Sequence, residues 1–243
     1  LIISTPEDLP KYRSLLSNGK LIGMNFSYKE QVYPDGLAHA FILGEEFIGN
    51  ENVCLILGDN IFYGSNLPQT LRSAVKRVHD SNIATVFGYY VNDPERYGVV
   101  EFDDDDNAIS LEEKPSNPKS NYAVSGLYFY PNDAVDIAKN QKPSGRKELE
   151  ITDTNRVYLS QKRLKVEKLG RGCAWLDTGT HDSLLEASQF VQILEKRQGV
   201  KISCIEEIAF RMGYIDRDAL LGIGKKMKNN PYGHYLITVA EEN

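Results

Sequence analysis

Strand-like apolar runs alternate with helix-like stretches along the first 91 residues, and this order limits the fold more than any other feature. The runs typical of buried strands lie at 1–4, 24–31, 52–57 and 83–91. Stretches with helical spacing or helix-start residues lie between them, at 5–16, 37–47 and 67–79. A β-α-β-α-β-α-β order predicts an α/β domain with a mostly parallel sheet and right-handed crossovers.

The second part of the chain adds a hairpin, three further strands and a helical tail. The hairpin is predicted at 99–102 and 109–111, around the acidic turn 103–106, which we interpret as a solvated turn and not a metal site. Strands are expected at 122–130, 164–169 and 173–176, and a helix at 149–159. We therefore expect a core over 1–180 with a β-hairpin insertion, and a C-terminal helical extension over 181–243 that forms an oligomer interface.

Composition excludes several classes of protein. Lys and Arg number 28 against 34 Asp and Glu, a net charge of −6, which is unsuited to nucleic-acid binding. The chain has no apolar stretch of about 18 residues that would span a membrane. Its three cysteines are widely spaced, with no CxxC pair, as expected of a protein in a reducing cytoplasm.

Two aspartates follow apolar strands at distant points of the chain. Gly58-Asp59-Asn60 follows the run at 52–57, and Asp177 follows the run at 173–176. Ligands of open α/β folds bind at the carboxyl ends of strands, and carboxylates suit Mg²⁺, so the two residues are candidates for one metal site. The alternatives are that Asp59 only caps a helix and that Asp177 only forms a turn before an N-capping Thr180.

Charged residues after the hairpin are candidates for binding a sugar phosphate. A carboxylate such as Glu113 accepts hydrogen bonds from sugar hydroxyls, and Lys114 beside it can hold an anion. The alternative is that this segment is a charged edge with salt-bridge partners. Arg146, in a Ser-Gly-Arg-Lys loop, is either a second phosphate contact or a solvated cation. Gln31 and Gly36 border a turn; a glutamine can pair with a pyrimidine edge, yet alone this is an ordinary turn.

Taken together, these segments resemble the glucose-1-phosphate thymidylyltransferases, a family of sugar nucleotidylyltransferases. The matching segments include Asp-Pro-Glu-Arg-Tyr-Gly at 93–98, Glu-Glu-Lys-Pro at 112–115 and Lys-Ser-Asn-Tyr-Ala at 119–123. Further matches cover 31–38, 57–64, 126–130, 148–153 and 175–180. So many collinear segments are far more specific than any single motif.

The resemblance implies a Rossmann-like nucleotidyltransferase fold and an enzyme that joins dTTP and glucose 1-phosphate, with Mg²⁺, to give dTDP-glucose and pyrophosphate. It implies a cytoplasmic homotetramer that serves dTDP-rhamnose and polysaccharide synthesis. Carried over by position, the family roles are: thymine contacts for Gln31 and Gly36; Mg²⁺ for Asp59 and Asp177; the sugar pocket for Tyr97, Gly98, Glu113 and Val124; and the sugar phosphate for Lys114 and Arg146.

The sequence departs from the family pattern at its beginning. The family has a first strand and a Gly-Gly-x-Gly-Thr-Arg loop that cradles the triphosphate, and neither is present in this sequence. We therefore expect the 243 residues alone to be inactive. The alternatives are a sister nucleotidylyltransferase with another nucleotide or sugar, or a catalytically inert nucleotide-sugar-binding fragment. A glycosyltransferase that places Mg²⁺ with strand-end acids is disfavoured by the segment Glu112–Pro115.

Overall fold

The computed structural model describes residues 1–242 and divides the chain into two compact units. One unit combines residues 1–32 with the chain from residue 185 onward, and the other comprises residues 33–184. The expected division after residue 180 stays a prediction about domains. No helix within residues 1–242 is long and apolar enough to cross a membrane.

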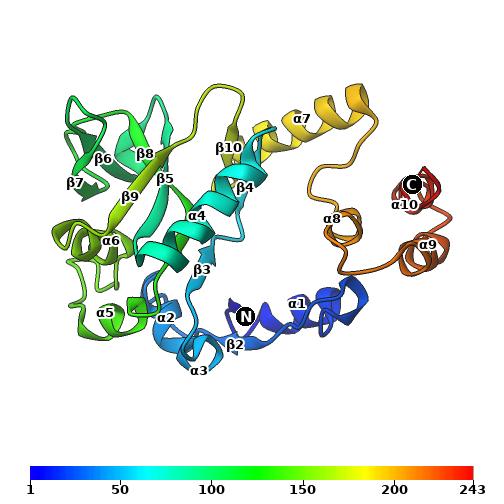
Figure 1. Cartoon of the computed structure of the whole chain (residues 1–243), viewed down its shortest axis with the longest axis horizontal. Helices are drawn as coiled ribbons and strands as arrows, with labels where there is room; N and C mark the ends of the chain where they lie inside the picture. Colours follow the sequence, from blue (N-terminus) through cyan, green and yellow to red (C-terminus); the bar gives the residue numbers. More distant parts are fainter. Residues whose placement is uncertain (243) are drawn as a thin grey trace. The chain divides into compact units, whose positions relative to one another are not determined.

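The 33–184 unit is built on a six-stranded sheet (Figure 1). Its strands are β3 (Val53–Ile56), β5 (Ala84–Tyr90), β6 (Gly98–Phe102), β7 (Ala108–Glu113), β8 (Tyr122–Tyr130) and β9 (Leu164–Lys168). The order is β7-β6-β8-β5-β9, and β3 also pairs with β8. β6 and β7 form the expected antiparallel hairpin.

The expectation of a mostly parallel sheet was wrong. β5 and β9 are parallel neighbours, whereas β8 runs antiparallel to β3, β5 and β6. β3 and β5 do point the same way, as a helical crossover requires, but β8 lies between them. A strand order along the chain does not reveal that a later strand fills the space between two earlier ones.

Helices cover both faces of this sheet because β8 is apolar on both. On one face, Leu127 and Phe129 pack with Phe87 against α4 (Leu67–Ser81), through Ala74 and Val78. On the other face, Tyr128 and Tyr130 pack against α2 (His39–Leu43), α5 (Ala134–Asn140) and α6 (Ile151–Ser160). The short α3 (Glu45–Ile48) follows α2. The unit is thus a three-layer α/β/α structure, with β8 at its centre.

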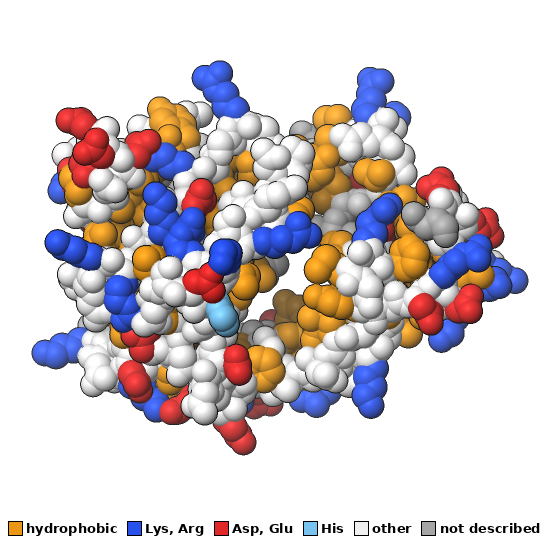
Figure 2. Space-filling view, viewed as in Figure 1, with side chains coloured by type: hydrophobic (Ala, Val, Ile, Leu, Met, Phe, Trp, Pro, Cys, Tyr) orange, Lys and Arg blue, Asp and Glu red, His pale blue; other side chains and the backbone are white. Residues whose placement is uncertain are grey.

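A second, two-stranded sheet in the same unit brings distant segments together. β4 (Asn60–Tyr63) pairs antiparallel with β10 (Ala174–Asp177), so that Asn60 lies opposite Asp177. The 3₁₀ turn η2 (Pro94–Arg96) leads into β6. The acidic turn at 103–106 is exposed, and Asp103 accepts bonds from the backbone of Asp105 and Asn107; its carboxylates form a red group at the edge of the hairpin in Figure 2.

The other unit has its own small core. β1 (Ile2–Ser4) pairs in parallel with β2 (Tyr28–Glu30), and α1 (Leu9–Leu16) and η1 (Lys20–Ile22) connect them. The first two predicted strands therefore belong to this sheet and not to the main one. The helices that follow α7 (His181–Gln198) are α8 (Ile205–Arg211), α9 (Arg217–Lys226) and α10 (Pro231–Glu241). Leu220, Ile223, Leu236 and Val239 form the core between α9 and α10.

Candidate active site

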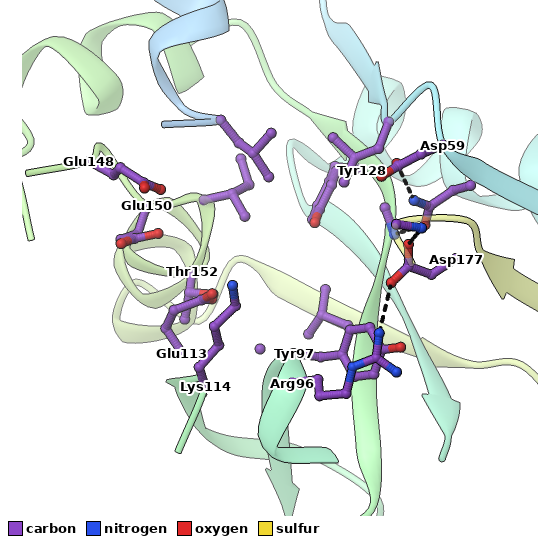
Figure 3. A pocket seen from close by; sticks show the side chains of 18 of the residues that line it. Asp59, Arg96, Tyr97, Glu113, Lys114, Tyr128, Glu148, Glu150, Thr152 and Asp177 are labelled. Carbon is purple, nitrogen blue, oxygen red and sulfur yellow. Dashed lines mark hydrogen bonds and ion pairs between the residues drawn. The ribbon is translucent and has the colours of Figure 1, made fainter. Parts of the chain in front are cut away.

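A cavity of about 600 Å³ opens in the 33–184 unit, lined by residues from strand ends and loops (Figure 3). Eight of the ten residues predicted from the sequence line it: Asp59, Tyr97, Gly98, Glu113, Lys114, Val124, Arg146 and Asp177. They come from segments up to 118 residues apart in sequence, so their meeting is a result of the fold. The roles assigned to them stay predictions.

Asp59 and Asp177 lie on the same wall of the cavity because β4 pairs with β10 (Figure 3). Thr178 donates to the Asp59 carbonyl through its backbone nitrogen and its hydroxyl, both at 2.9 Å. Asp177 also has the turn role considered above, since its Oδ1 accepts from the Gly179 nitrogen at 2.9 Å. Thr180 caps α7 by accepting from the Ser183 nitrogen at 3.2 Å. A turn role and a place in the cavity coexist at this strand end.

The acid pair fits a divalent cation of the Mg²⁺ type. Two carboxylates offer hard oxygen ligands, and Mg²⁺ commonly takes one or two protein carboxylates and completes its octahedron with water and substrate phosphates. No set of three His, Cys, Asp or Glu side chains within residues 1–242 is grouped as a metal cage. In a site with two carboxylates, water and substrate phosphates would supply the remaining ligands.

Arg96 is a cavity residue that the sequence reasoning did not select. Its guanidinium donates to Asp93 at 2.8 Å, lies 4.0 Å from the Asp177 carboxylate and stacks over the Tyr97 ring at 5.3 Å. The hydrogen bond with Asp93 raises the pKa of Arg96, and burial raises the pKa of Tyr97. The cation thus partly balances the acid pair on its side of the cavity.

The opposite wall presents Glu113 in a fixed position. Its Oε2 accepts from the Thr152 hydroxyl at 2.5 Å. Gly98 faces this pair, and a side chain there would come within 2.9 Å of Thr152 Oγ1. Lys114 follows with a positive φ of 45°, and its backbone nitrogen donates to the Tyr97 carbonyl at 2.9 Å. The unusual backbone turns the Lys114 side chain toward the cavity beside Glu113 (Figure 3).

Arg146 is held at the cavity by carboxylates. Its Nε and Nη2 donate to the two oxygens of Glu150 at 3.0 and 2.7 Å, and Nη2 also reaches Glu113 at 3.4 Å. The bond to Glu150 raises the pKa of Arg146. Burial alone would raise the pKa of Glu150, but the bonds from Arg146 and Ser144 outweigh it and lower that pKa. Arg146 is therefore an ordered cation and not a freely solvated one.

The two predicted base-contact residues do not line this cavity. Gly36 lies beside it with a positive φ of 98°, packed so closely on Leu149 that a side chain would come within 2.4 Å of its carbonyl. The neighbouring Leu37 does reach the cavity. Gln31 belongs to the other compact unit. Their role in binding a base stays a prediction.

Further cavity residues were not predicted individually, although they lie in segments that match the family. They include Asn60, Tyr128, Glu148, Glu150, Thr152 and Trp175. A Tyr inside an apolar strand or a Thr near a helix start is indistinguishable from a structural residue until the strands are paired. Asn60 ends the Gly-Asp-Asn turn in the matched segment 57–64, and its side chain bonds to Asp59, Gly126 and Trp175.

Comparison with known proteins agrees with this geometry. The model of the nucleotidyl transferase family matches residues 1–193. A glucose-1-phosphate thymidylyltransferase of Neisseria meningitidis is 53% identical over 242 residues, covering 100% of this chain and 83% of that protein. The enzyme of the same name from Mycobacterium tuberculosis is 52% identical, with the same two coverages.

Solved structures give the same result. A Bacillus anthracis protein described as a glucose-1-phosphate thymidylyltransferase, crystallised with sucrose, superposes with a TM-score of 0.69 at 38% identity, over 78% of this chain and 74% of that one. A UDP-glucose pyrophosphorylase complexed with UDP-glucose superposes with a TM-score of 0.62 at 29% identity, over 76% and 74%. The chain therefore belongs to the nucleotidyl transferase family, together with the glucose-1-phosphate thymidylyltransferases.

Proposed function

We propose that this protein transfers the thymidylyl group of dTTP to glucose 1-phosphate, giving dTDP-glucose and pyrophosphate. The observation that carries the proposal is the convergence of eight predicted residues on one cavity in a chain so similar to thymidylyltransferases throughout. The UDP-glucose pyrophosphorylase shares the fold but is only 29% identical to this chain, against 53% for the Neisseria thymidylyltransferase. We therefore propose dTTP and not UTP as the nucleotide substrate. Gln31 and Gly36 would contact thymine.

The charges of the cavity argue for a divalent cation. Five carboxylates line it (Asp59, Glu113, Glu148, Glu150 and Asp177), against three cations (Arg96, Lys114 and Arg146). Both substrates are multiply anionic, so they would meet a net negative surface. Mg²⁺ held by Asp59 and Asp177 would offset this repulsion and stabilise negative charge on the phosphates during transfer.

The remaining residues would bind and align the sugar phosphate. Glu113, fixed by Thr152, is placed to accept hydrogen bonds from sugar hydroxyls, and Gly98, Tyr97 and Val124 would shape the pocket around the ring. Lys114 and Arg146 would hold the phosphate. The sugar phosphate is itself an anionic nucleophile, so alignment with the α-phosphorus replaces a general base.

Assembly and location follow from the same proposal. We expect a homotetramer in the cytoplasm, working on soluble substrates without nucleic acid or membrane. The dTDP-glucose formed would supply dTDP-rhamnose for polysaccharide synthesis.

The test is release of pyrophosphate by the full-length protein from dTTP and glucose 1-phosphate. Mg²⁺ should support the reaction, and a chelator should abolish it until Mg²⁺ is restored. Lys139→Ala is a matched control for Lys114→Ala. Lys139 lies on α5, forms an ion pair with Glu45 and does not line the cavity. Loss of activity with Lys114→Ala but not with the control supports the proposal; no pyrophosphate from the wild-type protein contradicts it.

A further inference from the structure

The side chain of Asn60 connects three separate elements around the cavity. Its Nδ2 donates to Asp59 Oδ1 at 2.7 Å. Its Oδ1 accepts from the Trp175 indole nitrogen at 2.6 Å and from the Gly126 backbone nitrogen at 3.0 Å. Asn60 thereby links the β4 strand end to the middle of β8 and to β10.

These partners leave one orientation for the Asn60 amide. The oxygen and nitrogen of an asparagine side chain are told apart only by the bonds that they make. The indole nitrogen and the backbone nitrogen are both obligate donors, so both must face Oδ1. The Nδ2 group must then face Asp59, where a carboxylate oxygen accepts from it.

The surroundings leave the Asn60 amide room to reach β8. At Gly126 a side chain would come within 2.6 Å of Asn60 Oδ1 and 2.8 Å of Leu57 Cδ1, so the absence of a side chain there lets the amide reach β8. The backbone of Asn60 is paired with Asp177 through the β4–β10 register. One residue is thus bonded to the carboxylate of Asp59 by its side chain and to the strand of Asp177 by its backbone.

We propose that Asn60 is a positioning residue that sets the direction of the Asp59 carboxylate, with Trp175 and Gly126 fixing the amide that holds it. This inference rests on the proposed function, because the direction of the Asp59 carboxylate matters only if Asp59 binds the metal and the phosphates. Trp175 then acts on the acid pair without touching Asp59, through the oxygen of Asn60.

Asn60→Asp and Asn60→Ala separate this role from a purely structural one. Aspartate keeps an oxygen for both donors but replaces the bond to Asp59 by a second negative charge, whereas alanine removes all three bonds. If Asn60 only links the three elements, aspartate should preserve turnover. If Asn60 positions the Asp59 carboxylate, aspartate should not preserve it. We expect both variants to lose about 10- to 100-fold in turnover, the range for a hydrogen bond to a charged group.

Trp175 supplies a readout that needs neither metal nor substrate. It is the single tryptophan of the 243-residue sequence, and the position of its indole N–H signal in an NMR spectrum reports its hydrogen bond. We expect the signal of substrate-free protein to keep its hydrogen-bonded position in Asn60→Asp and to move upfield in Asn60→Ala. If Asn60→Ala does not fold, the aspartate variant carries the test alone.

The outcomes are distinct. An Asn60→Asp protein with the indole signal retained and turnover reduced supports the proposal. Wild-type turnover and wild-type Mg²⁺ dependence in that variant overturn it, and so does loss of the indole signal in it. A full-length wild-type protein that is itself inactive overturns the proposed function instead, whereas the indole signal still shows whether the hydrogen-bond network exists.

Discussion

Gly98→Ala should raise the KM for glucose 1-phosphate because the added methyl group separates Glu113 from Thr152. The methyl carbon would lie 2.9 Å from Thr152 Oγ1 and 3.3 Å from Glu113 Oε2, where these two atoms are now 2.5 Å apart. Thr152 would have to turn away, and Glu113 would lose a bond to its charged group, worth about 1.5–3 kcal/mol. That energy corresponds to about a 10- to 100-fold loss in kcat/KM.

The loss in kcat/KM should affect glucose 1-phosphate and not dTTP. Glu113 would bind sugar hydroxyls in the ground state and the transition state alike, so the KM for glucose 1-phosphate rises while kcat and the KM for dTTP change little. Pyrophosphate release measured at varied glucose 1-phosphate and saturating dTTP gives the comparison. Gly170→Ala is the matched control, because a side chain at that exposed position meets nothing within 4 Å.

A companion variant excludes direct blocking of the sugar by the methyl group. Thr152→Ala removes the hydroxyl and so should raise the same KM by itself. Adding Gly98→Ala to it should then cost little more, since the crowded atom is gone and the bond is already lost. Fully additive effects, or a Gly98→Ala protein with unchanged KM for glucose 1-phosphate, would refute the reasoning.

Three further predictions concern the metal, pH and assembly. Asp59→Asn and Asp177→Asn should each lower turnover by about 100-fold or more, because each removes a charge from the metal site; near wild-type rates in either variant would leave that Asp with a structural role only. Glu150 has a pKa below its ordinary value of 4.5, so its stabilising contribution is complete above that pH and declines as pH falls through the lower folded value. The melting-temperature gap between wild type and Glu150→Gln should therefore narrow below about pH 4.5, and a constant gap would contradict the assignment. Light scattering at micromolar concentration should show an oligomer, since Leu184, Leu185 and Ile193 of α7 are exposed; a monomer alone would contradict this.

Local patterns were enough to locate most elements of the fold. The strand predicted at 122–130 is β8 with the same bounds, because nine apolar or small residues between polar turns leave little choice. β4 was not predicted, since Asn60–Tyr63 has only four residues and is stabilised by pairing with β10, far along the chain. The prediction of a mostly parallel sheet was wrong for the same reason. The relative direction of neighbouring strands depends on which strands pair, and that is a property of the whole sheet.

The candidate site likewise contains residues that could be predicted from the sequence and residues that could not. Acids at strand ends, such as Asp59 and Asp177, are recognisable as candidates from position alone, and the antiparallel pairing of β4 with β10 brings the two together. Residues that work through partners are not: Asn60 acquires its bonds only when β4, β8 and β10 meet. Arg146 illustrates a middle case, since its charge was evident but its pairing with Glu150, four residues on, was not.

The most direct test of the central claim is a competition among substrates. The full-length protein would receive equal concentrations of dTTP, UTP, CTP, ATP and GTP with Mg²⁺, and of glucose 1-phosphate, galactose 1-phosphate and mannose 1-phosphate, and the nucleotide sugars formed would be identified by mass and chromatography. The proposed function predicts dTDP-glucose as the main early product. A mixture without preference, or a main product with another base or sugar, would contradict it.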